Sequence, residues 1–245
     1  MGNLYVVGFG PGGYEHMTAK CIDVIEKADI VTGYTTYVEM LKEFFPDKTY
    51  LATPMMQEVK RCRMAVEEAM KDQTVAMVSS GDSGIYGMAG IIYQVAEEMG
   101  ADIEIETVPG VTAASAAASV LGAPLMHDFA VISLSDLMTP LDLIMKRVDC
   151  AGQSDLIVCL YNPKSKKRTG YVEQAADILM KYRSPGTPVG IVRHAGRKGE
   201  QSQITTLAEL KDAEIDMFSV VLIGNSQTYV SNGRMITPRG YNLEK

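Results

Sequence analysis

The stretch VVGFGPGGYEHMT, residues 6–18, points to the fold class because it joins an apolar strand to a helix through a glycine loop. The apolar run starts at Leu4 and has strand length, and a helical pattern begins at Met17. A strand that leads directly into a helix is the opening of a βαβ unit, in which helices cover parallel strands. This stretch therefore predicts an α/β protein.

The same alternation continues along the chain. In the first half the predicted strands are 4–7, 30–32, 75–78 and 103–108, and the predicted helices are 17–27, 37–45, 58–70 and 88–99. In the second half the predicted strands are 130–134, 156–160, 189–192 and 220–223, and the predicted helices are 140–150, 169–182 and 207–211. We expect two αβα domains with mainly parallel sheets.

The two expected domains are 1–121 and 122–245. Glycine and proline in Leu121-Gly122-Ala123-Pro124 interrupt a helix of small residues at 112–120 and mark the join. Ligands tend to bind in clefts at domain interfaces, so we expect the active site in the cleft between the domains.

Composition excludes several classes of protein. The net charge of −7 disfavours nucleic acid as the main partner, and no apolar run reaches the roughly 18 residues that span a membrane. The four cysteines form no C-x-x-C pair and the three histidines no H-x-x-x-H pair, so no metal site is expected. We recognise no targeting segment, and we expect a cytoplasmic protein.

The glycine loop matches the G-x-G-x-x-G pattern of dinucleotide-binding proteins at Gly8, Gly10 and Gly13. Two features oppose that interpretation. Pro11 removes one of the backbone N–H groups that would face a pyrophosphate. The second predicted strand and the two residues after it, 30–34, contain no acid to bind the ribose, and Asp29 precedes the strand. A nicotinamide cofactor is therefore disfavoured.

A second motif, GDSG at 81–84, also surrounds the nucleophile of trypsin-like proteases. Those enzymes are all-β and carry their triad in the order His, Asp, Ser. Here the strands alternate with helices, and His16, inside the glycine loop, is the only histidine before this motif. The match is a coincidence.

Three loops that contain glycine follow three predicted strands of the first half. They are GFGPG at 8–12, SGDSG at 80–84 and VPGVTA at 108–113. In a parallel sheet the loops after the strands gather at one edge, which is where α/β proteins bind ligands. With these spacings the set resembles the tetrapyrrole (corrin and porphyrin) methylases. That family commonly has proline where this chain has Ser83, so we expect a slightly less rigid loop there.

Within that family the second half resembles the C17-methyltransferases of cobalamin biosynthesis. The matching runs are ISLSDLMTP at 132–140, LYNPKSKKR at 160–168, VRHAGR at 192–197 and ITPRGY at 236–241. The resemblance implies a homodimer that binds S-adenosylmethionine between its domains. It also implies methylation of precorrin-3B or cobalt-factor III with ring contraction, and the sequence leaves these two substrates open.

The resemblance also implies site residues. Those implied to bind the cofactor are Pro11, Ser80, Gly81, Asp82, Ile85, Thr112, Ala113, Asn162 and Ala195. The macrocycle carries many carboxylates, which the basic residues could neutralise. The residues expected to contact it are Gly10, Gly12, Lys166, Lys167, Arg168 and Arg193, and Lys164 and Arg197 are further basic candidates.

No catalytic residue is identified. A methyl group on a sulfonium is already activated, so neither a triad nor paired carboxylates are needed for its transfer. Ring contraction requires a proton to move, and the weak candidates are Ser135, Asp136 and His194, together with Ser133 and Tyr161. Two alternative functions stay open, namely methylation at another carbon such as C11 or C20, and a non-catalytic corrinoid or nucleotide binder on the same scaffold.

Overall fold

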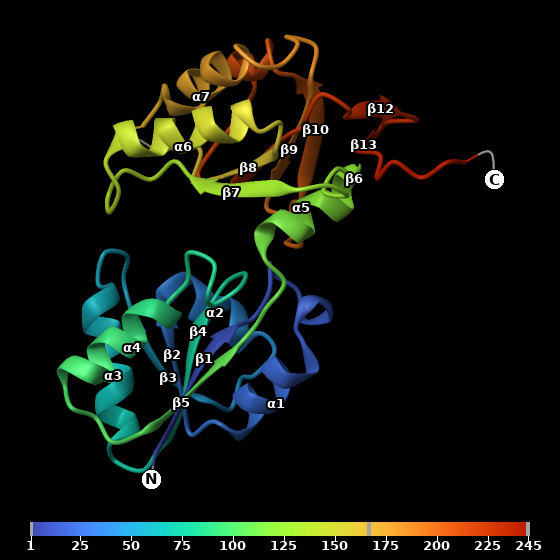
Figure 1. Ribbon diagram of the computed structural model, residues 1–245. Helices are drawn as coiled ribbons and strands as arrows, with labels where there is room; N and C mark the ends of the chain where they lie inside the picture. Colours follow the sequence, from blue (N-terminus) through green and yellow to red (C-terminus); the bar gives the residue numbers. More distant parts are fainter. Residues whose placement is uncertain (1, 166–167, 244–245) are drawn as a thin grey trace. The chain divides into compact units, whose positions relative to one another are not determined.

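The computed structural model describes residues 2–165 and 168–243 and shows two compact units, Met1–Ala113 and Ala114–Lys245 (Figure 1). Helix α5, Ala113–Leu121, belongs to the second unit except for its first residue, Ala113. The domain boundary expected from the sequence lies at the other end of this helix.

The first unit is a five-stranded parallel sheet with helices on both faces, as predicted. Its strand order is β3-β2-β4-β1-β5. The strands are β1 Asn3–Gly8, β2 Ile30–Tyr34, β3 Thr49–Thr53, β4 Thr74–Ser79 and β5 Glu104–Val108. The helices are α1 Ala19–Lys27, α2 Thr35–Lys42, α3 Glu58–Ala69 and α4 Ala89–Glu98, with a 3₁₀ turn, η1, at Tyr14–His16.

Strand β1 lies between β4 and the edge strand β5 and is buried on both faces. Leu4 and Val6 pack with α3 and α4, whereas Val7, and Phe9 just after the strand, pack in a second cluster with α1 and α2. A strand covered on both sides reads as a continuous apolar run, which explains why the opening stretch was informative.

The second unit contains a five-stranded sheet in the order β10-β9-β11-β8-β7. The strands are β7 Phe129–Ser133, β8 Ile157–Tyr161, β9 Pro188–Arg193, β10 Gln201–Thr206 and β11 Ser219–Ile223. The expectation of a mainly parallel sheet is wrong here, because only β7 and β8 pair in parallel and the other pairs are antiparallel. The turn at 194–200 joins β9 to β10 and is too short for the crossover that parallel strands need.

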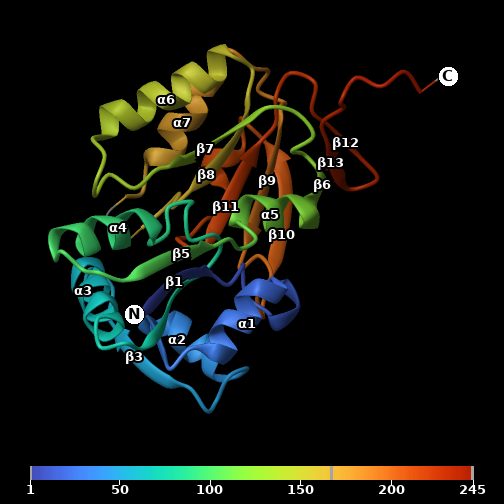
Figure 2. The same ribbon diagram turned by 60° about the horizontal axis from the view of Figure 1, so that its bottom comes forward.

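Helices cover both faces of this second sheet as well (Figure 2). Helices α6, Leu141–Gln153, and α7, Tyr171–Leu179, pack on one face with Val189 and Ile191 of β9. Gly190 faces the other side and lies so close to Leu121 of α5 that a Cβ there would be 2.3 Å from a leucine methyl carbon.

Short elements complete the second unit. Strands β6, Gly122–Ala123, β12, Tyr229–Ser231, and β13, Arg234–Ile236, form a small sheet in the order β12-β13-β6. The helix predicted at 207–211 is only a 3₁₀ turn, η2, at Leu210–Asp212. Buried Leu207 and Leu210 gave that segment its apolar pattern, but the pattern is too short to sustain an α-helix.

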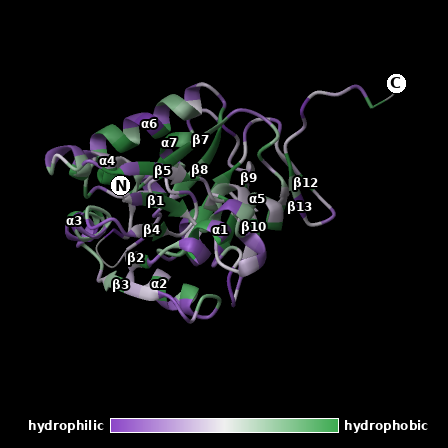
Figure 3. Cartoon of the chain, turned by 90° about the horizontal axis from the view of Figure 1, so that it is seen from below, coloured by the Kyte–Doolittle hydropathy of each residue, from purple (hydrophilic) through white to green (hydrophobic). Residues whose placement is uncertain are grey.

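Hydropathy follows this layering: strands β7 and β8 are coloured as hydrophobic, and α6 carries hydrophilic and hydrophobic stretches in turn (Figure 3). Within 2–165 and 168–243, none of the helices combines the length and the apolar character of a membrane span.

Candidate functional site

Three adjacent strands of the first unit, β4, β1 and β5, each end in a loop that contains glycine. We call residues 9–13 loop 1, residues 80–88 loop 2 and residues 109–112 loop 3. Loops 1 and 2 are joined as a short antiparallel bridge, in which Gly10 N–H donates to the Gly81 carbonyl at 3.0 Å and Gly81 N–H donates to the Gly10 carbonyl at 2.7 Å. The expected grouping of the three loops at one sheet edge is confirmed.

The glycines of these loops are required because the backbones touch. A Cβ on Gly8, at the end of β1, would lie 2.6 Å from the Gly81 carbonyl oxygen. A Cβ on Gly110 would lie 2.3 Å from the same oxygen and 2.4 Å from that of Gly8. The loops therefore form one packed unit in which Gly8 and Gly110 serve close backbone contact.

Asp82 fastens loop 2 to loop 3. Its Oδ1 accepts hydrogen bonds from the N–H groups of Gly84, at 2.8 Å, and Ile85, at 3.1 Å. Its Oδ2 accepts from the N–H of Gly110 at 3.0 Å. The carboxylate thus positions Ile85 as well as the third loop, and any effect of Asp82 on a ligand is exerted at least partly through the shape of these loops.

Ser83 adds a second tie between β5 and loop 2. Its side chain is fully buried, and its hydroxyl donates to the Val108 carbonyl at 3.1 Å. Proline, common at this position in the family that the sequence resembles, could not make that bond. The hydroxyl therefore gives this loop an anchor of its own.

The structure brings seven of the nine expected cofactor residues together in the first unit. Ser80 Oγ donates to the Gly10 carbonyl at 3.4 Å, and Ile85 is 40% exposed. All seven lie in the three loops or directly after loop 3: Pro11, Ser80, Gly81, Asp82, Ile85, Thr112 and Ala113. Asn162 and Ala195 belong to the second unit.

A polar cluster lies at the carboxyl ends of β7 and β8 in the second unit. Asn162 follows β8 in the left-handed conformation, with φ at 51°, and its Nδ2 donates to Ser133 Oγ at 2.9 Å. Ser135 N–H donates to the same hydroxyl at 3.2 Å. The Tyr161 hydroxyl accepts from Ala114 N–H at 2.6 Å. Ser133, Ser135, Tyr161 and Asn162 thus gather in one place, as parallel β7 and β8 dictate.

Asp136 is held in its ionised form. The Tyr171 hydroxyl donates to its Oδ2 at 2.8 Å, and Arg168 Nη1 lies 3.7 Å from Oδ1. The hydrogen bond from Tyr171, together with the charge of Arg168, lowers the pKa of Asp136. Among the catalytic candidates, Asp136 is therefore suited to hold Arg168 in place, whereas its lowered pKa makes it a weaker proton acceptor.

Arg168 belongs to the basic run, of which Lys166 and Lys167 lie outside the described residues. Its side chain is only 12% exposed, and its buried Nε has no hydrogen-bond partner within the part of the chain described. Of the other expected substrate residues, Gly10 and Gly12 lie in loop 1, and Arg193 lies at the end of β9.

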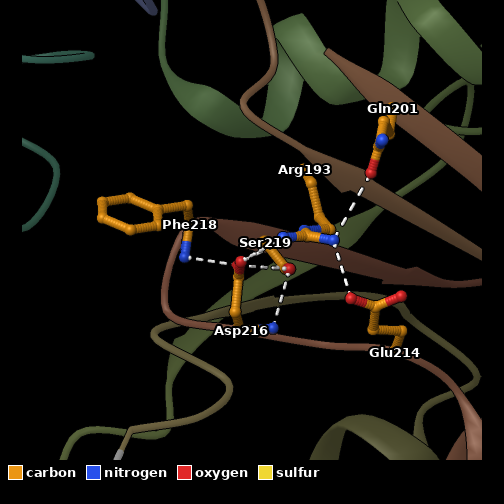
Figure 4. A network of polar contacts seen from close by, with 6 residues as sticks. All are labelled: Arg193, Gln201, Glu214, Asp216, Phe218 and Ser219. Atoms are coloured by element: carbon orange, nitrogen blue, oxygen red, sulfur yellow. Dashed lines mark hydrogen bonds and ion pairs between the residues drawn. The ribbon is translucent and has the colours of Figure 1, made fainter. Parts of the chain in front are cut away.

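Arg193 is already paired within the second unit (Figure 4). Its Nη2 lies 2.8 Å from Asp216 Oδ2, and its Nη1 donates to Glu214 at 3.0 Å and to Gln201 at 3.4 Å. Burial alone would raise the pKa of Asp216, but hydrogen bonds from Ser219 and the Phe218 N–H, with the charge of Arg193, lower it overall. The charge expected to meet a substrate carboxylate is thus neutralised inside the protein.

His194 lies in the tight turn after β9. Its φ is 51°, a conformation that residues other than glycine seldom adopt, and its ring stacks on Phe218 with centroids 5.1 Å apart. Its carbonyl accepts from the Arg197 N–H at 2.8 Å. The ring is fixed by the turn and by its aromatic neighbour, and Ala195 beside it is 8% exposed.

One feature of the first unit was missed by sequence reasoning. A cavity of about 210 Å³ opens beside loop 2, and Arg61 of α3 lines it together with Tyr34, Ser79 and Tyr86. The signal was present, because Arg61 stands in helical register with buried Ala65 and Ala69. A charged residue on the apolar stripe of a helix indicates a buried cation.

The whole chain is similar to methyltransferases. The family model for Tetrapyrrole (Corrin/Porphyrin) Methylases matches residues 3–211. A probable cobalt-factor III C(17)-methyltransferase of Salmonella typhimurium is 48% identical over 98% of this chain and 100% of its own length. The cobalt-factor III methyltransferase of Priestia megaterium is 46% identical over 98% of this chain, which covers 45% of that longer protein.

A solved structure agrees with these relatives. The crystal structure of the methyltransferase CobJ matches 97% of this chain and 100% of its own, with a TM-score of 0.89 and 33% sequence identity. The chain belongs to the tetrapyrrole (corrin/porphyrin) methylases.

Proposed function

We propose that this chain is an S-adenosylmethionine-dependent methyltransferase that methylates C17 of cobalt-factor III, with ring contraction, in cobalamin biosynthesis. The observation that carries the proposal is 48% identity to a relative named for this reaction, over the whole length of that relative. Precorrin-3B is the competing substrate, because it would bring the same carboxylates to the protein.

Loop 2 fits the proposed cofactor. Gly81 has a φ of 72°, and at the position where its Cβ would stand the nearest atom is Ala113 N, 3.9 Å away. Bare backbone next to open space suits close contact with a ligand, as in other glycine loops at this edge of an α/β sheet. The cofactor residues of this proposal in the first unit are Pro11, Ser80, Gly81, Asp82, Ile85, Thr112 and Ala113, and in the second unit Asn162 and Ala195.

The chemistry divides between the cofactor and the chain. When bound, S-adenosylmethionine supplies an electrophilic methyl group with an activated leaving group. The chain contributes position, because methyl transfer needs the ring carbon in line with the methyl group, and such alignment lowers a barrier by roughly 7–11 kcal/mol. The bonds among loops 1, 2 and 3 provide the rigidity that this alignment requires.

Mass spectrometry tests the proposed reaction directly. The purified chain is incubated without oxygen with S-adenosylmethionine and either cobalt-factor III or precorrin-3B, and the position of the new methyl group is read by NMR with a ¹³C-labelled donor. One added methyl at C17 with ring contraction supports the proposal. A methyl group at C11 or C20, or binding of the tetrapyrrole without a mass change, contradicts it.

The cofactor preference gives a first prediction. Calorimetric titration should show binding of S-adenosylhomocysteine and none of NAD, because Pro11 removes a pyrophosphate-binding N–H from loop 1 and no acid follows β2 for the ribose. Tight binding of NAD without binding of S-adenosylhomocysteine would contradict the assignment.

The basic run gives a second prediction. Replacing Lys166, Lys167 and Arg168 with Gln should raise the apparent KM for the tetrapyrrole by about 3- to 10-fold and flatten its salt dependence, because single ion pairs with a ligand contribute little each and are screened by salt. Positive side chains just before the first turn of α7 gain nothing from the helix dipole. Asp136 already lies beside Arg168, so we expect an external anion to compensate chiefly the two lysines.

A matched control removes the same charge elsewhere. The control uses three exposed lysines that each pair with an acid three or four residues earlier in the chain, namely Lys27, Lys42 and Lys71. Their replacement with Gln should leave the tetrapyrrole KM unchanged. Equal KM values for the two triple variants at low salt would show that the basic run is a solvated turn without a role in substrate binding.

Assembly and location belong to the same proposal. We infer a cytoplasmic homodimer from the family that the chain belongs to. Light scattering of the purified protein tests the dimer, and a monomeric mass at micromolar concentration would contradict it.

A further inference from the structure

The cavity beside loop 2 lies wholly within the first unit. Tyr34 and Tyr37 border it from β2 and α2, Arg61 from α3, Ser79 from the end of β4, and Tyr86 from loop 2. Its volume of about 210 Å³ is smaller than the roughly 300–1,000 Å³ of pockets that enclose a whole drug-sized ligand. The cavity is therefore of a size for one arm of a larger molecule.

Arg61 brings an unpaired positive charge to this cavity. The residue is 4% exposed, its Nε donates to Thr53 Oγ1 at 2.9 Å, and its Nη2 donates to the Pro54 carbonyl at 3.0 Å and the Thr53 carbonyl at 3.5 Å. Its Nη1 reaches only the sulfur of Met88, at 4.0 Å. Among residues 2–165 and 168–243, no carboxylate lies within 4.0 Å of this guanidinium.

The energetics of this cation favour an anion from outside the chain. Burial lowers the pKa of Arg61, and the nearby carboxylate of Glu58 only partly opposes that effect. A buried charge without an acidic partner destabilises the folded chain, and a ligand carboxylate that accepts from an N–H of Nη1 would offset that cost. Because Nε and Nη2 already donate to Thr53 and Pro54, the geometry left at Nη1 is that of a single charge-assisted N–H···O bond.

Ser79 is a second buried polar group at the cavity that lacks a partner. Its side chain is 5% exposed, and its hydroxyl has no hydrogen-bond partner in the described part of the chain. Because Val75 and Met77 of β4 pack with α3, Ser79 stands on the face of the sheet that carries Arg61. One ligand oxygen could therefore meet both groups.

Most of the remaining walls suit an aliphatic arm, and Glu58, whose Oε1 accepts from the Met56 N–H at 3.2 Å, is an acidic group that also borders the cavity. Tyr34 and Tyr37 form an edge-to-face pair with ring centroids 5.2 Å apart, and the Tyr34 ring lies 5.9 Å from the guanidinium carbon of Arg61. Met55 and Met88 add thioether side chains. An acetate or propionate group presents the matching combination of methylenes and a terminal carboxylate.

We propose that this cavity receives one acetate or propionate arm of the tetrapyrrole, whose carboxylate is anchored by Arg61 and Ser79. The inference rests on the proposed function, since it takes its ligand from the macrocycle. It assigns Arg61 as a residue that positions the macrocycle on the first unit and selects for a charged arm. The carboxylate of S-adenosylmethionine is the other source of the same chemistry, and the experiment separates the two.

The experiment compares two substitutions with a matched control. Arg61→Gln removes the charge, and Ser79→Ala removes the unpaired hydroxyl. Thr32→Val is the control, because Thr32 on neighbouring β2 also has a buried hydroxyl without a partner within the described ranges but does not line the cavity. Binding of cobalt-factor III is measured by anaerobic absorbance titration, binding of S-adenosylhomocysteine by calorimetry, and melting by circular dichroism.

We expect Arg61→Gln to raise the Kd for cobalt-factor III by roughly 10- to 100-fold, the range for a hydrogen bond to a charged group. Ser79→Ala should raise it about 10-fold, the lower end of the same range, because its hydroxyl would donate to the same carboxylate. Thr32→Val should not change it, and none of the three should change the Kd for S-adenosylhomocysteine. A carboxamide derivative of the macrocycle should bind wild-type protein and Arg61→Gln equally.

Several outcomes would overturn the assignment. Equal cobalt-factor III affinity for wild type, Arg61→Gln and Ser79→Ala would show that the cavity holds no arm of the macrocycle. If the variants instead lose affinity for S-adenosylhomocysteine, the carboxylate in the cavity belongs to the cofactor. If Arg61→Gln does not fold, the comparison of Ser79→Ala with Thr32→Val decides. Failure of the wild-type protein to bind or methylate either tetrapyrrole would instead defeat the proposed function itself.

Discussion

Replacing Gly110 with alanine is expected to destabilise the first unit by about 3 kcal/mol, the upper part of the range for overpacked sites. The new Cβ would lie 2.3 Å from the Gly81 carbonyl oxygen and 2.4 Å from that of Gly8. Both oxygens belong to the backbone, one in loop 2 and one at the end of β1, and cannot rotate away, so the loops must separate. We expect affinity for S-adenosylhomocysteine to fall because the loops no longer keep their shape, and the methyl-transfer rate to fall on the order of 100-fold, since a displacement of about 1 Å is enough for such a loss of rate.

Gly90→Ala is the matched control. Gly90 lies in the first turn of α4, has no atom within 4 Å of its hypothetical Cβ, and carries no positive φ. Alanine there should stabilise the protein by up to about 1 kcal/mol and leave cofactor binding unchanged. Urea unfolding and calorimetry measure both quantities. If Gly110→Ala has the same urea unfolding transition and the same affinity for S-adenosylhomocysteine as wild type, the three loops are not packed as closely as the structure indicates.

The fold of the first unit was predictable because it rests on a local sequence pattern, an apolar strand followed by a glycine loop, that repeats along the chain. Strands β1 and β4 are buried on both faces and therefore read as short apolar runs, and each is followed by a glycine loop. The order of three loops along the chain was enough to place them at one edge of a parallel sheet. Strand β3 escaped notice because Thr49–Thr53 lies at the sheet edge and is mostly half-buried or exposed.

The sheet of the second unit was less predictable because strand direction depends on partners far along the chain. Strand β11 pairs with β8 and with β9, and no local pattern states that both pairings are antiparallel. Strand β10, Gln201–Thr206, is polar and half-buried or exposed at the sheet edge. No apolar pattern in the sequence therefore predicted this strand or its pairing with β9. Once β10 is known, the short turn at 194–200 requires an antiparallel hairpin.

Side-chain partners explain the differences at the site. Arg193 was expected to meet substrate because it is basic and lies in a family-like run, yet Asp216 and Glu214, more than twenty positions away, already neutralise it. Arg61 shows the converse, because its nearest hydrogen-bond partners leave one end of the guanidinium for something else. Residue type indicates what chemistry is available, whereas the fold decides which charges are already paired.

Replacing Asp82 with alanine is expected to raise the Kd for S-adenosylhomocysteine by at least about 10-fold, since three hydrogen bonds to one charged group are lost together. The N–H groups of Gly84, Ile85 and Gly110 would lose their acceptor, so loop 2 would loosen and loop 3 would lose its tie to it. Melting should change less than in Gly110→Ala, because water can replace the carboxylate at these part-exposed groups and no clash is introduced.

Asp155→Ala provides the comparison that separates loop shape from stability. Asp155 also ties two distant segments, since its carboxylate accepts from Ser226 N–H at 2.9 Å and from the Ser226 hydroxyl at 2.6 Å. Its removal should lower the melting temperature of the second unit and leave the affinity for S-adenosylhomocysteine unchanged. Both variants delete a carboxylate that fastens loops. A loss of cofactor affinity in Asp82→Ala alone would therefore place the effect at the three loops. An unchanged Kd for S-adenosylhomocysteine in Asp82→Ala would show that Asp82 has no part in the cofactor site.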